Sequence, residues 1–246
     1  MMRAGVRLAV TRLLALTFTC ATAITVAGTP DLRGVWQVHA GSTLRPVDGG
    51  AVPLTAEGKT LYERNQRAVA SGDRAIDLTA RCASPGMPRI MLLPYPFEIL
   101  QQPDHIVFLF GWNQVFRQLV MTGQRDEYVL PSTMGYSLGH WQDDSLIVDT
   151  TDFGDKTFLD STGLPHSDQL KLTERLHLAA GGKELELRLT IADPKFYTRP
   201  WDATLRFTRQ RRATLDEDVC LDRVEAGRPA IETPAQRRRQ PTRPAR

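Results

Sequence analysis

Two neighbouring stretches of the chain place an apolar residue at every second position, with a single exception at Glu174. Leucine alternates with other residues over 170–178, and leucine or isoleucine does so over 185–191. Ala-Ala-Gly-Gly follows the first stretch, and glycines at such a point are typical of a tight hairpin. A period of two puts alternate side chains on opposite faces of a sheet. The pair therefore predicts an antiparallel hairpin with one buried face.

The same alternation, interrupted by turn signals, continues over most of the chain. Pro103-Asp104 and Asp143-Asp144 separate further strand-like segments. One amphipathic helix is expected at about 55–70, with Thr55 as its N-cap and an apolar stripe that includes Leu61 and Val69. We expect a mainly β fold, a single antiparallel β-barrel or strongly curved sheet of about 8–10 strands with one main helix. The expected strands are 34–39, 96–102, 105–112, 113–123, 134–142, 145–153, 170–178, 183–193 and 201–210.

The two ends of the chain differ from the middle. Residues 1–28 combine three arginines, a short apolar run and small residues, which is the pattern of a secretory signal peptide. Residues 224–246 are rich in Pro and Arg and poor in large apolar residues, so we expect a disordered basic tail. The barrel domain is then 29–223. This organisation predicts a periplasmic or secreted protein with no stable membrane span after processing.

Charge argues against a nucleic-acid partner. The net charge is +3, but the first 28 residues carry three Arg and no acidic residue, and the last 23 carry six Arg and two Glu. Residues 29–223 therefore carry a net charge of −4. A domain without an excess of basic residues lacks the electrostatic footprint of a nucleic-acid binder.

Two cysteines, Cys82 and Cys220, remain once the signal peptide is removed. An even pair in an exported protein favours a disulfide. The bond would fix the end of the last strand segment to the loop near Cys82.

A short signature accompanies the strand pattern. Gly34-Val35-Trp36 on the first strand and Arg206 or Arg209 on the last are similar to the layout of calycins and lipocalins, in which an Arg from the last strand covers such a Trp. The chain also resembles a group of exported bacterial proteins of unassigned function. The matching stretches cover most of residues 31–222 and are DLRGVW, PLTAEGKTLYERN, RCASPGMPR, PYPFEI, MGYSLGHWQDDSLIVDT, PHSDQLKLTER and DPKFYTRPW. The resemblance implies one domain but no particular reaction.

Four polar residues interrupt the apolar rows of predicted strands. Glu174 stands among the leucines of 170–178, Arg117 among the apolar residues of 115–121, and Tyr136 and His140 in a row with Met134 and Leu138. Inward polar groups in an apolar lining are typical of a barrel that binds a polar ligand. Arg117 and Glu174 could pair, which would remove most of the cost of burying them. Structural ion pairs, edge-strand charges or a surface histidine are the alternatives.

Loops supply four further candidates. His166 precedes the Glu174 strand and could act as a general acid or base, or could simply be exposed in a turn. Tyr197 and Arg199 lie between the last two expected strands, and Trp201 lies where this loop meets the last one. Their aromatic and guanidinium groups suit stacking and carboxylate binding, or a loop filled by its own aromatic rings.

The sequence has no Gly-rich phosphate loop, no GxSxG and no CxxC, and its five histidines show no HxH or HExxH spacing. We therefore expect no cofactor and no metal. The first hypothesis is an exported, cofactor-independent enzyme of lyase, decarboxylase, hydratase or isomerase type, acting on a hydrophobic, aromatic or carboxylate-bearing small molecule inside the barrel. Arg117 would bind the anion, His166 or His140 would move the proton, Glu174 would orient the histidine or act as base, and Tyr136 would stabilise charge. The alternatives are a lipocalin-like carrier of an apolar ligand and a structural protein of the envelope.

Overall fold

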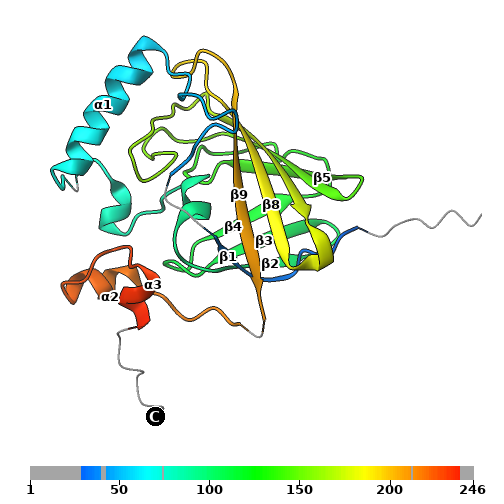
Figure 1. Ribbon diagram of the computed structural model, residues 1–246. Coiled ribbons are helices and arrows are strands. Elements are labelled where there is room, and N and C mark those ends of the chain that lie inside the picture. The colour runs from blue at the N-terminus through cyan, green and yellow to red at the C-terminus, as the bar shows by residue number, and fades with distance from the viewer. Residues whose placement is uncertain (1–28, 40–42, 74, 212, 239–246) are drawn as a thin grey trace, which may run out of the picture.

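The described residues contain nine β-strands that form one closed barrel and follow one another around it in chain order (Figure 1). This computed structural model describes residues 29–39, 43–73, 75–211 and 213–238, so the predicted signal peptide lies outside the described residues. The mainly β barrel with one main helix is confirmed. The strands are β1 (Gly34–Val38), β2 (Phe97–Gln101), β3 (His105–Phe110), β4 (Phe116–Val120), β5 (Tyr136–Gln142), β6 (Ser145–Thr151), β7 (Lys171–Leu178), β8 (Glu184–Ala192) and β9 (Trp201–Gln210).

One neighbouring pair among the described strands departs from the expected antiparallel order. β4 and β5 run parallel and share the register pairs Leu119↔Ser137 and Val120↔Leu138. Because parallel neighbours need a connection that returns to the starting end, residues 121–135 cross from one end of the barrel to the other. This crossover carries Tyr128 and Leu130, which are 87% and 86% exposed.

Six helical segments connect or follow the strands in the described residues. They are α1 (Ala56–Ala70), η1 (Leu78–Arg81), η2 (Arg89–Leu92), η3 (Ala180–Gly182), α2 (Cys220–Glu225) and α3 (Pro234–Arg238). Given the strand directions, the connections β1–β2, β3–β4, β6–β7 and β8–β9 all lie at the same end, which we call the loop end. The β1–β2 connection holds α1, η1 and η2, and Figure 1 shows α1, α2 and α3 on the same side of the barrel.

The signature on the first and last strands forms a packed unit. Trp36 is fully buried, and its indole Nε1 donates to the carbonyl oxygen of Leu32 at 3.0 Å. The guanidinium carbon of Arg209 lies 4.6 Å from the centre of the Trp36 ring, and Nη2 of the same side chain donates to the carbonyl oxygen of Asp31 at 2.8 Å. Arg206, the other candidate, pairs with Glu186 instead.

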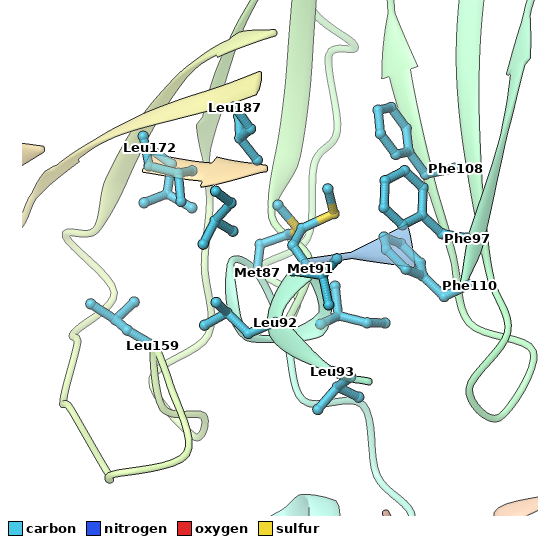
Figure 2. Close-up of a cluster of buried hydrophobic side chains, with 14 of the residues drawn as sticks. Met87, Met91, Leu92, Leu93, Phe97, Phe108, Phe110, Leu159, Leu172 and Leu187 are labelled. Carbon is cyan, nitrogen blue, oxygen red and sulfur yellow. The ribbon is translucent and has the colours of Figure 1, made fainter. Parts of the chain in front are cut away.

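The interior of the barrel is filled partly by its own strands and partly by the segment that contains η2. Met87, Met91 and Leu92 are almost fully buried and belong to the same apolar cluster as the strand residues. Figure 2 shows Met87 and Met91 between a group of phenylalanines on one side and Leu172 and Leu187 on the other. Each such side chain contributes roughly 1.5–3 kcal/mol through burial. This segment therefore acts as a plug within the barrel.

Helix α1 begins where the sequence predicts, because Thr55 Oγ1 accepts a hydrogen bond from Gly58 N at 3.0 Å. The face that packs against the rest of the protein is less apolar than expected. Gly58 and Asn65 are its buried residues, whereas Val69 is exposed. A Cβ on Gly58 would lie 2.4 Å from the carbonyl oxygen of Phe196, so the helix approaches the β8–β9 connection at backbone contact distance.

The C-terminal segment differs from the disordered tail that its composition predicts. Residues 224–238 are described, and Ala230 and Glu232 are buried. Trp112 Nε1 donates to the carbonyl oxygen of Ala230 at 2.9 Å, so a few backbone acceptors and aromatic contacts hold a segment with few large apolar residues. Residues 239–246 lie outside the described residues.

The sulfur atoms of Cys82 and Cys220 lie 2.03 Å apart, which is disulfide-bond distance, as the cysteine count predicts. The pair joins the end of η1 to the start of α2. The cross-link therefore ties the C-terminal segment to the loop end. Among the described residues, no helix combines the length and apolar character needed to cross a bilayer.

Candidate functional site

Arg117 and Glu174 meet inside the barrel. Arg117 Nη1 donates to Glu174 Oε1 at 3.0 Å, and Nη2 donates to Glu174 Oε2. Arg117 Nε donates to Ser137 Oγ at 3.1 Å, and Nη2 also reaches Thr150 Oγ1 at 2.8 Å. Arg117 is 3% exposed and Glu174 1% exposed. The break in the leucine row is thus half of a buried ion pair with all its charged atoms bonded.

Strand register explains why this pair forms. Ser137 is the direct partner of Thr150, and Val148, two residues before Thr150, is the partner of Glu174. Hydroxyls from β5 and β6 therefore lie between the charged residues of β4 and β7. Arg117 and Glu174 do not line any of five cavities that open among the described residues.

The predicted orientation of Tyr136 and His140 is wrong. On β5 the buried row is Ser137 and Gly139, while Tyr136 is only half-buried and His140 is exposed. The reason is the size of two side chains, one on β4 and one directly after it. Arg117 occupies the space beside Ser137, and a Cβ on Gly139 would lie 2.5 Å from the sulfur of Met121. Because β5 has to present small residues inward, its larger residues face outward despite their apolar pattern.

Tyr136 instead takes part in a surface contact. Its hydroxyl accepts a hydrogen bond from Asp126 N at 3.0 Å, and the guanidinium of Arg125 lies 5.1 Å from its ring centre. The structure therefore separates Tyr136 and His140 from the pair of Arg117 and Glu174.

His166 lies in the β6–β7 connection, at the loop end, and its imidazole is fixed at both nitrogens. Nδ1 is 3.1 Å from the carbonyl oxygen of Ser167, and Nε2 is 2.8 Å from Thr157 Oγ1. A carbonyl oxygen only accepts, so Nδ1 carries the proton and Nε2 of the neutral ring accepts from the Thr157 hydroxyl. Burial lowers the pKa of His166 below its ordinary value of 6.5, although the Ser167 carbonyl oxygen and the charges of Asp193 and Asp155 oppose this effect.

The β8–β9 connection holds the segment that carries His166. The carboxylate of Asp193 accepts from Ser167 N at 2.5 Å and from Ser167 Oγ at 2.9 Å. Tyr197 donates its hydroxyl hydrogen to the carbonyl oxygen of Pro165 at 2.6 Å. Burial, together with nearby Asp193, raises the pKa of Tyr197 well above its ordinary value, so it stays a donor. Residues on both sides of His166 are thus anchored to a neighbouring loop.

A cavity of about 330 Å³ opens beside His166, between α1 and residues 155–166. Its apolar lining comes from α1, from the approach to η1 and from the β6–β7 connection, and its polar lining includes Thr157 and His166. The apolar lining residues are Leu61, Ile76, Leu78, Phe158 and Pro165, and the polar ones are Arg64, Asn65, Asp155, Lys156, Thr157 and His166. A concave, mostly apolar site with a few polar groups is typical of small-molecule binding.

The other predicted loop residues do not line this cavity. Tyr197 and Trp201 are buried with their ring centres 5.8 Å apart, which corresponds to the alternative of a loop filled by its own aromatic rings. Arg199 is exposed, and its Nη2 lies 3.4 Å from Asp48 Oδ2. Of the residues selected from the sequence, His166 is the one placed at this cavity.

Sequence reasoning missed Thr157, Arg64 and Lys156. Thr157 lies in a connection with no periodic pattern, and Arg64 lies on a helix whose polar residues read as solvent-facing. The sequence gives only a weak indication that Arg64 faces a site. Leu61, Arg64 and Asn65 are spaced three and four residues apart and therefore share one face of α1.

No model of a known protein family matches the sequence, and no curated protein matches it significantly. Within the described part of the chain, no group of three or more His, Cys, Asp or Glu side chains is placed to hold a metal ion.

Proposed function

We propose that the protein is an exported enzyme that needs no cofactor and uses His166 as the proton-transfer group on a small molecule bound in the cavity beside α1. One observation carries this proposal. A neutral imidazole, with its tautomer set by a carbonyl oxygen, holds a hydroxyl at hydrogen-bond distance next to a cavity of ligand size. This is the geometry that a general base needs.

The lowered pKa of His166 favours the role of base. At neutral pH the ring is unprotonated, so Nε2 has a lone pair available toward Thr157. When a substrate places an acidic C–H or O–H group beside Thr157, its proton moves to Oγ1 while the Thr157 proton moves to Nε2. The electron pair left on the substrate shifts into an adjacent conjugated group. Return of the proton to a second atom completes an isomerisation, and its delivery to a departing group completes an elimination.

The buried ion pair has a different role in this proposal. Arg117 and Glu174 are bonded to each other and to two hydroxyls, so they stabilise the barrel and do not contact the substrate. The signal-like start of the sequence and the cysteines at bonding distance support export to the periplasm or beyond.

The experiment begins with native mass spectrometry of the protein isolated from its own host, to identify a retained small molecule. That molecule is then incubated with the wild type in D₂O, and deuterium incorporation and product formation are followed by NMR. His166→Gln should lower the rate by about 10²–10⁴-fold, because glutamine can accept the Thr157 hydrogen bond but cannot take up the proton.

His140→Gln is the matched control, because His140 lies exposed on the outer wall of the barrel. It should turn over the molecule at the wild-type rate. Retention of the molecule without turnover by the wild type would instead identify a carrier. Equal rates in wild type and His166→Gln would refute the role of His166.

A further inference from the structure

We infer that the cavity beside His166 takes a monoanionic, carboxylate-bearing molecule with an apolar body, and that Arg64 and Lys156 recognise its carboxylate. The inference rests on the proposed function for the reaction, but the binding site can be tested alone. It assigns a binding role to residues of α1 and of the β6–β7 connection.

Two cations at the cavity have no carboxylate partner in the described part of the chain. Arg64 and Lys156 line the cavity, and neither forms an ion pair within the described part of the chain. Several other arginines do have a carboxylate partner, for example Arg89 with Asp77 and Arg125 with Asp152. Cations without a protein partner at the rim of an apolar cavity are available to a ligand anion.

The charges of the cavity lining sum to a small positive value. Asp155 also lines the cavity and contributes one negative charge, while His166 is neutral. With Arg64 and Lys156 the lining therefore carries a net charge of +1. A carboxylate neutralises that charge, whereas a phosphate dianion would exceed it and lie near Asp155. The balance favours a carboxylate over a phosphate.

The rest of the cavity lining is largely apolar. Leu61 lies one helical turn before Arg64 on the same face of α1, and Ile76, Leu78 and Phe158 provide apolar contacts from other segments. A volume of about 330 Å³ is at the lower end of the range for small-molecule pockets, roughly 300–1,000 Å³. The site suits a compact apolar group, such as one ring, that carries a carboxylate.

The test compares benzoate with its neutral analogue benzamide. Each is titrated into the mature protein, which is the whole chain without the predicted signal peptide, and binding is followed by NMR. Benzoate should bind more tightly at low ionic strength and lose that advantage at high salt, because screening weakens exposed charge interactions. Arg64→Gln and Lys156→Gln should each weaken benzoate binding by about fivefold or more and change benzamide binding by less than twofold.

Arg67→Gln is the matched control. Arg67 lies on the same helix and lines the neighbouring groove, not this cavity. Its replacement should leave benzoate binding unchanged. Equal binding of benzoate and benzamide, absence of binding by both, or equal effects of Arg64→Gln and Arg67→Gln would each overturn the inference.

His166→Gln separates this inference from the proposed function. If both are right, the variant still prefers benzoate over benzamide but loses turnover of the native substrate. If the preference for benzoate persists and no turnover is found even in the wild type, the binding site stands and the catalytic proposal fails.

Discussion

Replacing Glu174 with glutamine should lower the free energy of unfolding by about 3–5 kcal/mol, because it leaves a buried guanidinium without its counter-charge. Two of the hydrogen bonds of Arg117 end on Glu174, one of them at 3.0 Å. Bonds to charged groups contribute roughly 1.5–3 kcal/mol each, which is consistent with that total. For a protein of this size the melting temperature should fall by roughly 6–20 °C.

Removing both charges together should have a much smaller effect. Arg117→Met combined with Glu174→Leu keeps the interior volume similar and eliminates the cost of desolvating two ions. The hydroxyls that are left behind can still bond each other, because Ser137 Oγ and Thr150 Oγ1 are already 3.1 Å apart. We expect this double variant to be within about 1 kcal/mol of the wild type or more stable.

Urea-induced unfolding at pH 7, followed by tryptophan fluorescence, measures all three proteins. Glu186→Gln is the control, because the pair of Arg206 and Glu186 has a similar distance, 3.0 Å, but is exposed on the outer wall. Breaking it should cost less than about 1 kcal/mol. The reasoning is refuted if Glu174→Gln costs no more than Glu186→Gln, or if the double variant is as unstable as Glu174→Gln.

Three further results are expected. Replacing Cys82 and Cys220 with serine removes a cross-link over 138 residues, and a loss of up to about 5 kcal/mol should appear in thermal unfolding. The pKa of His166 is below 6.5 in the folded state, so the folded protein binds fewer protons than the unfolded chain just below that pH. Stability should therefore fall as the pH drops from about 6.5, by up to about 1.4 kcal/mol per pH unit, and His166→Gln should remove this slope in urea titrations at several pH values. Gly86→Ala should destabilise more than Gly227→Ala, because both have φ near +75° but a Cβ on Gly86 alone would meet a carbonyl oxygen, at 2.6 Å; equal losses in chemical denaturation would contradict this.

The alternation of apolar residues was sufficient to predict the strands, because each one has a face that must be buried. All nine expected strands are present in the described residues. The hairpin between β7 and β8 and the one through Asp143-Asp144 follow from local turn chemistry. The parallel pair of β4 and β5 could not be predicted in this way, because strand direction is not encoded in the periodicity of one segment.

The contrast between Glu174 and His140 shows where the strand pattern fails. Both interrupt an apolar row, yet Glu174 faces inward and His140 faces outward. On β7 the neighbouring strands leave room for a full row of large side chains. On β5 the long side chains of Arg117 on β4 and of Met121 directly after it take that room, so the inward row consists of small residues. Packing between neighbours therefore decided the orientation, and one strand's sequence does not contain that information.

The candidate cavity could be predicted only in part. His166 was identifiable because a histidine in a loop at the mouth of a barrel can act as a general acid or base. The residues that share its cavity, Thr157, Arg64 and Lys156, come from a connection without periodicity and from a helix far away in the sequence, so their proximity is a property of the fold. The order of the C-terminal segment likewise depends on contacts with Trp112 and Tyr95 that its own composition does not predict.

The parallel contact between β4 and β5 follows from simple parity. In a closed ring, each antiparallel neighbour reverses the chain direction, and after a full circuit the direction must return to its starting value. The number of reversals must therefore be even, which nine described strands cannot satisfy unless at least one neighbouring pair is parallel. The crossover 121–135 is thus a consequence of an odd strand count. Loss or gain of one strand at this seam would give a ring that alternates throughout, and the long crossover would no longer be needed.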